Sequence, residues 1–413
     1  MKKIINRMIN FIDRYEKVYL LVLLGYFFIR GITFEETWFT LLPVSTFVLL
    51  IIEVFRTHKI RADIREILIV LSLLSFYAFW GEYLIMGMGL MVMCLAFFVF
   101  AKCLAINHSR NDYFVENVLI LFSFGILCLG VLEYIPFFVN LISGGEWTEE
   151  WPAFWRHDLV RRTNFDLYFA PMSGMIMYGL YKVFKKEIKG IVVLLVSLLA
   201  VLIPCFSQGR MVLCASALTI VVLLLYLIIK ERKQPLVART ILIILGVILV
   251  LGVLAELAVS FDWLGIGTAF KNSWLNGSMG LLHNIRFNMK PDQLKLLPKF
   301  PWGRCTVPLQ YPFYNNLPYD DPHDLWLFVA RKGGVIPFVL FVSFSGLITV
   351  DLIKLWRVET ISVELLLCVT GIFYAVNLYC WCESVIEGRP YMWAFVCFVS
   401  GVIRGINLRY EDV

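Results

Sequence analysis

Long uninterrupted apolar runs are the feature that most limits how this chain can fold. Stretches of roughly 17 to 25 mostly apolar residues recur along the sequence, and a helix of that length spans a hydrocarbon core about 30 Å thick. Barrel strands do not fit, because they alternate apolar and polar residues over only about ten positions. Only 16% of the 413 residues are charged, against about 25% in soluble domains. The sequence therefore predicts an all-α, polytopic membrane protein that forms a single membrane domain over residues 1–413.

The positions of the apolar runs predict about twelve transmembrane helices. The first run follows a basic amphipathic lead and shows no small-residue cleavage pattern, so we interpret it as a retained span rather than a signal peptide. A large connection separates the ninth predicted span from the tenth. The predicted spans are 18–34, 38–55, 66–80, 84–106, 115–142, 164–184, 188–206, 211–229, 240–260, 334–353, 361–382 and 390–407.

Lysine and arginine are distributed unequally between the two sets of connections. More than half of the 37 basic residues lie in short connections on the side of the N-terminus. Cytoplasmic loops are enriched in Lys and Arg, so this side is predicted to be cytoplasmic, with both termini inside. The net charge of +6 is then explained by topology and by contact with anionic membrane lipids, and it does not indicate a nucleic-acid partner. The basic connections are 2–17, 56–65, 102–110, 182–189, 230–239, 354–357 and 404–409.

Two long connections, 143–163 and 261–333, are predicted to lie on the extracytoplasmic side. Loops of this length are usually functional or disordered, and their many aromatic residues argue against disorder. The larger one is expected to contain short helical pieces broken at Pro291 and Pro298, and a final short helix that stops before a pair of glycines. The loop tryptophans fit an interfacial aromatic belt or a surface that stacks on sugars.

Ionisable side chains gather at the outer ends of the predicted spans. Charges at membrane depth are costly, so the default interpretation is a functional one. Arg210 lies in a short turn between the seventh and eighth spans, where structural pairing is the alternative to a function. Several arginines around one outward cavity would suit a polyanion, because Arg binds phosphate oxygens bidentately. Other ionisable residues on this side are Glu133, Arg161, Arg162, Asp166, Glu256, Arg286, Arg304, Glu383, Glu387 and Arg389.

The segment DDPHD at 320–324 places a histidine among three aspartates at the start of a predicted helix. His323 has an intrinsic pKa near neutral pH, so it can accept a proton from a reacting group. Two plainer interpretations stand beside this one: an aspartate caps the helix, or the cluster holds a divalent ion. No metal-binding spacing is present among the ten cysteines, most of which lie inside apolar runs.

Three segments in order resemble the O-antigen ligase and O-antigen polymerase family of bacterial membrane glycosyltransferases. Residues 207–226 (SQGRMVLCASALTIVVLLLY) are similar to the family's Ser-x-x-Arg turn and the span after it. Residues 284–304 are similar to its Arg-containing helix and Pro-x-Gly turn. Residues 322–341 are similar to its His-Asn-x-x-Leu helix and glycine-bounded span. The resemblance covers about residues 160–407 and includes the predicted number of spans.

The sequence departs from the family pattern at three places within these segments. Asp324 stands where Asn is usual, Arg331 and Lys332 replace a commonly acidic stretch, and Arg304 stands where a second glycine is frequent. These departures leave the resemblance in place but bear on the identity of the acceptor.

The resemblance implies a metal-independent glycosyltransferase without a cofactor in the bacterial cytoplasmic membrane. A glycan on a polyprenyl-diphosphate carrier would be the donor at the outer face, and a hydroxyl of a glycan or lipid-linked acceptor would attack it. The polymerase and the ligase share these motifs, so both remain open. The alternative from a different class is a membrane transporter or flippase for a lipid-linked or anionic substrate.

The resemblance also implies roles for particular residues. Arg210 and Arg286 match the family's phosphate-contacting arginines, and Arg389 would be a further diphosphate contact. His323 would act as the catalytic base or would position the acceptor. Asp321 or Asp324 would support the orientation of its ring.

Overall fold

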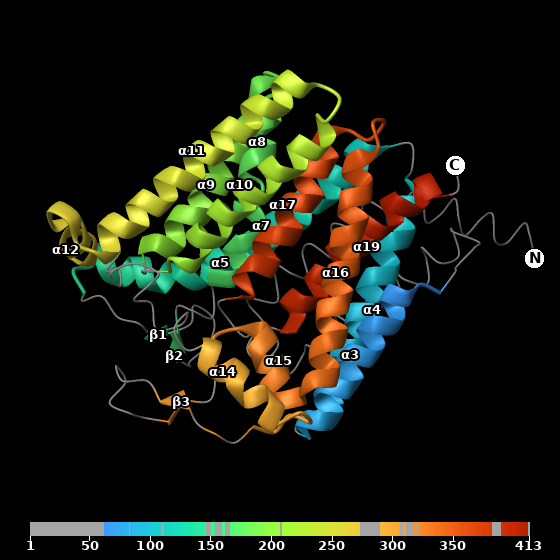
Figure 1. Cartoon of the computed structure of the whole chain (residues 1–413), viewed down its shortest axis with the longest axis vertical. Coiled ribbons are helices and arrows are strands. Elements are labelled where there is room, and N and C mark those ends of the chain that lie inside the picture. The colour runs from blue at the N-terminus through green and yellow to red at the C-terminus, as the bar shows by residue number, and fades with distance from the viewer. Residues whose placement is uncertain are drawn as a thin grey trace, which may run out of the picture.

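A computed structural model describes residues 62–411 of the chain except 82, 109–110, 146–149, 153–158, 162–165, 207–208, 273–289, 306, 308, 311–317, 320–321 and 382–389. The described residues form a bundle of long helices with shorter helices and two small strand pairs in the connections (Figure 1). This confirms the helical, multi-pass membrane fold that the apolar runs predict.

The elements follow the apolar runs of the sequence. The long helices are α3 (Ile64–Trp80), α4 (Leu84–Asn107), α5 (Asp112–Ile142), α9 (Ile188–Phe206), α10 (Met211–Lys230), α11 (Pro235–Ser260), α16 (Val335–Arg357), α17 (Val363–Tyr379) and α19 (Pro390–Glu411). The shorter helices are η2 (Leu167–Phe169), α7 (Ala170–Ser173), α8 (Ile176–Phe184), η3 (Trp263–Gly265), α12 (Ile266–Lys271), α14 (Lys290–Leu296), η5 (Leu297–Lys299) and α15 (Leu325–Gly333). The antiparallel strand pairs are β1 (Glu150–Pro152) with β2 (Leu159–Arg161), and β3 (Leu309–Gln310) with β4 (Pro318–Tyr319).

Seven helices within the described residues are long and apolar enough to cross a membrane. They are α4, α5, α9, α10, α11, α16 and α19, and each coincides with a predicted span. Helices α3 and α17 also lie on predicted spans, but each has 17 residues. The first two predicted spans, 18–34 and 38–55, lie outside the described residues.

The predicted span 164–184 is not one continuous helix. It is divided into η2, α7 and α8, with a turn at Gly174 and Met175 between the last two. At this turn the backbone of Gly174 lies against the backbone of Gly371 in α17, with no room for a side chain at either position. Apart from polar residues near its ends, such as Asp166 and Lys182, this region is mostly apolar, so hydropathy alone gave no sign of the interruption.

The helices differ greatly in how deeply they lie in the bundle. In α19, 89% of the apolar 18-residue segment that could span a membrane is buried inside the protein. In α11 the corresponding share is only 11%. Gly401 and Gly405 bring α19 close to the backbone of α4, as small residues do at contacts between membrane helices. Helix α19 therefore lies in the interior, whereas α11 lies at the edge and presents apolar side chains to the surrounding lipid (Figure 1).

Buried ion pairs join the helix ends at one end of the bundle, which we call the cationic end. Here the guanidinium of Arg65 donates to Asp63 at 2.9 Å and to Asp351 of α16 at 2.7 Å. Arg404 of α19 donates to the other oxygen of Asp63 at 2.6 Å, and Asn407 donates to Asp351 at 2.8 Å. Burial alone would raise the pKa of Asp63, but hydrogen bonds from Arg65 and Arg404 outweigh it and lower the pKa to about 2.

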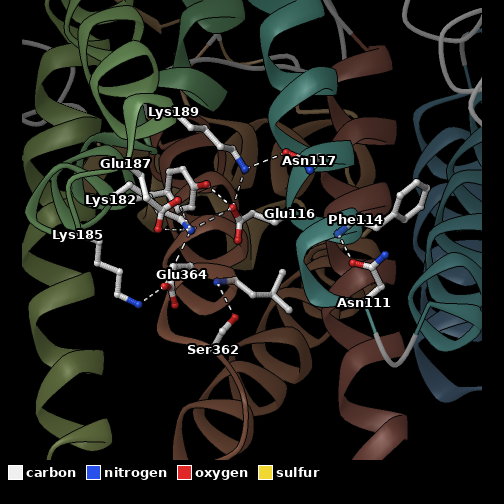
Figure 2. A network of polar contacts seen from close by, with 12 residues as sticks. Asn111, Phe114, Glu116, Asn117, Lys182, Lys185, Glu187, Lys189, Ser362 and Glu364 are labelled. Carbon is white, nitrogen blue, oxygen red and sulfur yellow. Dashed lines mark hydrogen bonds and ion pairs between the residues drawn. The ribbon is translucent and has the colours of Figure 1, made fainter.

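A second network at the cationic end joins α5, α8, α9 and α17 (Figure 2). Glu116 of α5 accepts a hydrogen bond from Lys189 at 2.7 Å and another from Tyr178. Lys182 lies among three carboxylates, at 3.1 Å from Glu187, 3.8 Å from Glu116 and 3.9 Å from Glu364. Within the described residues, basic connections that the sequence assigns to one side thus meet at one end of the bundle. Their pairing with carboxylates was not part of the prediction.

The opposite end, which we call the loop end, carries the two long connections. There α14, α15 and strands β1, β2 and β3 lie together below the bundle in Figure 1. Short helical pieces occur in the larger connection as predicted, but Pro291 lies within the first turn of α14, where proline is tolerated. The residues just before α14 lie outside the described part of the chain, and α14 gives way to η5 next to Pro298, as predicted.

The buried ion pair between Arg65 and Asp351 makes a testable prediction. Asp351→Leu leaves Arg65 with a missing partner in the interior and should lower the free energy of unfolding by about 3–5 kcal/mol. The double variant Arg65→Met/Asp351→Leu removes both charges, leaves the Arg404–Asp63 pair in place, and should lose less stability than the single variant. Thermal and denaturant unfolding of the purified protein in detergent measures both.

The exposed pair of Lys233 and Glu359 supplies the control for this experiment. Both side chains are more than half exposed, and exposed ion pairs contribute little to stability. Lys233→Met should therefore leave unfolding nearly unchanged. A double variant that is less stable than Asp351→Leu alone would contradict the assigned role of the buried pair.

Candidate functional site at the loop end

Asp324 caps the N-terminus of α15 next to the candidate histidine. Its backbone is extended, and its Oδ1 accepts hydrogen bonds from the backbone N–H of Trp326 at 2.9 Å and of Leu327 at 3.1 Å. These bonds satisfy donors that a helix N-terminus otherwise leaves without partners. The interpretation that an aspartate caps this helix is therefore correct for Asp324, and the sequence did not identify which of the three it would be.

The second oxygen of the same carboxylate is held by a lysine from the large connection. Lys290, the first residue of α14, lies 2.7 Å from Asp324 Oδ2 and donates to the carbonyl oxygen of Trp381 at 2.6 Å. Burial raises the pKa of Asp324, and the positive charge of Lys290 partly offsets that rise. One ammonium group thus connects three segments: the large loop, the start of α15 and the end of α17. No motif in the sequence marked Lys290, which is one of several lysines in this loop.

His323 has a left-handed backbone conformation, with φ of 47°, and its side chain is half-buried. A residue with a Cβ atom pays roughly 1–2 kcal/mol for this conformation. Such conformations persist where the surroundings over-determine them, and they concentrate at functional sites. Leu325, two residues after His323, donates its N–H to the carbonyl of Cys380 at 2.8 Å. This bond fixes the segment after His323 to the end of α17.

Arg210 is the N-cap residue of α10 at the same end of the bundle, and its side chain is half-buried. The preceding Gly209 packs so tightly against the carboxylate of Asp166 that a Cβ atom would collide with it. Asp166 is almost fully buried and accepts a hydrogen bond from the hydroxyl of Tyr134 in α5. The turn that carries Arg210 therefore packs, through Gly209, against the buried carboxylate of Asp166.

The turn at 301–305 folds back onto the junction of α15 and α16. The N–H groups of Arg304 and Cys305 donate to the carbonyls of Lys332 and Arg331, each at 3.0 Å, and Val335 donates to the carbonyl of Pro301 at 2.8 Å. Gly303 and Gly334 have φ of 80° and 89°, a region that glycine enters without steric cost. Each also faces a backbone carbonyl too closely for a side chain, so glycine is required at both positions.

Hydrogen bonds from Arg331 also connect α15 to other parts of the large connection. Its guanidinium donates to the side chain of Gln293 in α14 at 2.6 Å and to the carbonyl of Val307 at 2.8 Å. Arg304 donates to the carbonyl of Phe79 at the end of α3 at 2.7 Å. Two of the three basic residues at which the sequence departs from the family pattern, Arg304 and Arg331, therefore hold the loop against the bundle.

The predicted site residues fall into two described groups and an undescribed one. His323 and Asp324 lie with Lys290 at the start of α15, and Arg210 lies beside Asp166 at the start of α10. Arg286, Asp321 and Arg389 lie outside the described residues. Among the described residues no group of three or more histidine, cysteine, aspartate or glutamate side chains is placed to hold a metal ion.

The cap at Asp324 gives a prediction that separates its two interactions. Asp324→Asn keeps an N-cap acceptor but loses the charge, whereas Asp324→Ala loses both. The alanine variant should be less stable than the asparagine variant by about 0.5–2 kcal/mol, because only it leaves the amide groups of α15 without a side-chain acceptor. Thermal unfolding in detergent compares the two. Equal stability of the two variants would show that the cap contributes nothing measurable.

Comparisons of the chain with protein-family models, with curated proteins and with solved structures found no match to any of them.

Proposed function

We propose that this protein transfers a glycan from a polyprenyl-diphosphate carrier to an acceptor hydroxyl at the outer face of a bacterial cytoplasmic membrane. In this proposal the chain has twelve spans, both termini are cytoplasmic, and the loop end faces outward. The product is a cell-surface polysaccharide or a glycan attached to a lipid acceptor.

One observation carries the proposal: the second and third segments of the family resemblance are joined in space. Backbone hydrogen bonds connect the turn at 301–305 to the glycine junction at 331–335. The first segment supplies Arg210, whose turn lies at the same end of the bundle as His323.

The proposed reaction is a substitution at the anomeric carbon of the donor glycan. A bond forms between the acceptor oxygen and this carbon, while the bond between the carbon and the phosphate oxygen breaks. Polyprenyl diphosphate leaves with the electron pair, and the proton of the hydroxyl passes to a base. His323 suits this role because imidazole is the side chain most often used to accept a proton near neutral pH.

The leaving diphosphate requires positive charge, which arginine provides in bidentate form. Arg210, Arg286 and Arg389 are the residues proposed for it. Arg210 emerges beside buried Asp166, which fixes the turn that presents it. Membrane insertion of the carrier places the diphosphate near the headgroup level, where the half-buried Arg210 begins its span.

A second candidate is a transporter or flippase for a lipid-linked or anionic substrate. The observation that favours it is the interruption of the predicted span 164–184 at Gly174 and Met175. Transporters often bind their substrates at discontinuous helices near the bilayer midplane. Release of polyprenyl diphosphate together with a lengthened or transferred glycan by the purified protein would exclude this candidate as the sole function.

The charge distribution predicts the orientation of the chain. A reporter fused after Asn316 in the large connection should report the extracytoplasmic side, and one fused after Arg232 in a basic connection should report the cytoplasm. Alkaline phosphatase and green fluorescent protein fusions provide complementary readouts. The reverse pattern would remove the basis for an outward-facing site.

The proposed roles of His323 and Arg210 predict large losses of activity without loss of the protein. His323→Ala and Arg210→Ala should each reduce glycan transfer by about 10²–10³-fold, because the first removes the base and the second removes a group that stabilises the charge of the leaving diphosphate. The assay uses purified protein with a polyprenyl-diphosphate-linked glycan and measures released polyprenyl diphosphate. Membrane insertion and elution on size exclusion should be unchanged.

Matched controls come from the cationic end of the bundle. His108→Gln and Arg232→Ala change the same residue types far from the loop end, and both should retain transfer activity. Near-normal activity of His323→Ala together with Arg210→Ala would remove the proposed mechanism.

A further inference from the structure

The start of α15 is held from three directions. Asp324 caps its own helix, Leu325 donates to the carbonyl of Cys380, and Lys290 joins Asp324 to the carbonyl of Trp381. The Lys290 ammonium also lies 5.5 Å from the centre of the Trp381 ring, within the range of a cation–π interaction. All three contacts fall within a few residues of His323.

His323 is the residue whose backbone these contacts constrain. Its left-handed conformation carries a steric cost that other conformations of the same loop would not carry. The segment before Asp324 would relax if Asp324 or the end of α17 could move. The contact of Lys290 with both Asp324 and the Trp381 carbonyl opposes that movement, because one charge holds the two segments at fixed separation.

We propose that Lys290 is a positioning residue that holds His323 in its reactive orientation by clamping Asp324 to the end of α17. This inference rests on the proposed glycan transfer. Lys290 acts through Asp324 and the Trp381 carbonyl, and it contacts neither the donor nor the acceptor. The large connection thereby serves the active site as a structural clamp as well as a covering loop.

The test measures the kinetics of glycan transfer by Lys290→Met. The variant should show a kcat lower by roughly 10- to 100-fold, because a displacement of about 1 Å in a reacting group produces losses of that size. The KM for the lipid-linked donor should change less than about twofold, because the diphosphate contacts are untouched. Lys290→Arg should restore part of kcat, since it retains a cation beside Asp324.

The double variant Lys290→Met/Asp324→Asn distinguishes positioning from simple charge compensation. Asparagine keeps the cap and removes the buried charge that Lys290→Met leaves without its partner. The double variant should therefore fold and elute like the wild type and still show the reduced kcat, because the link to Trp381 is absent. A wild-type kcat in Lys290→Met or in the double variant would overturn the inference.

Lys295→Met is the matched control on the same helix. Lys295 pairs with Asp292 within α14, and both side chains are about three-quarters exposed. This variant should retain the wild-type kcat. A loss equal to that of Lys290→Met would show that α14 as a whole is sensitive and would remove the specific assignment.

A labelling experiment tests the clamp without any enzymatic activity. Diethyl pyrocarbonate modifies accessible imidazoles, and mass spectrometry of the peptide that contains His323 reports its rate separately from those of the other four histidines. The rate at His323 should change at least threefold in Lys290→Met and remain constant in Lys295→Met. An unchanged rate in Lys290→Met would overturn the clamp even if transfer were observed. Absence of transfer by the wild type, with the labelling change present, would instead overturn the proposed function alone.

Discussion

The need to neutralise charge inside an apolar bundle governs this structure. An isolated charge in a medium of low dielectric constant is strongly disfavoured, so each buried ion requires a partner from a neighbouring helix. At the cationic end this requirement connects helices that are distant in the chain, as when Arg65 of α3 meets Asp351 of α16. The ion pairs therefore specify which helix ends become neighbours, a choice that apolar contacts alone leave open because they are not directional.

Buried charges also need partners at the loop end, where a different part of the chain supplies them. There the partners come from the loops instead of the helices: Lys290 for Asp324, and Gln293 and a carbonyl for Arg331. Because these loop residues complete the pairing of charges on α15, the large connection is a structural part of the bundle. Helix α14 is fixed by the charges that its side chains compensate.

Much of the helical architecture could be predicted from the sequence because hydropathy is a local property. The runs at 84–106, 188–206 and 211–229 became helices with nearly the same bounds. The interruption at Gly174 could not be predicted, since it depends on close contact with Gly371, nearly two hundred residues away in the chain. The pairing of the basic residues was missed for the same reason: the positive-inside rule gives the side of a charge and not its partner.

In the candidate site, too, local features could be predicted from the sequence and contacts between distant segments could not. The segment DDPHD indicated that a histidine lies at a helix start and that an aspartate could cap the helix, and Asp324 does so. The link through Lys290 arises only when α14 and α17 come together, so no spacing in the sequence could indicate it. The roles of Arg210 and His323 in catalysis remain predictions, which depend on the family resemblance and on the chemistry of their side chains.

The enclosed position of α19 has a consequence for the order in which this fold is assembled. Among the described helices α19 is the last to leave the ribosome, yet it supplies the interior surface against which α4 packs through Gly401 and Gly405. Until it arrives, the rings of Phe97 and Phe100 on α4, which pack against Phe398 of α19, lack that partner. The packing surface between α4 and α19 therefore forms only after α19 has been synthesised, later than the other described helices.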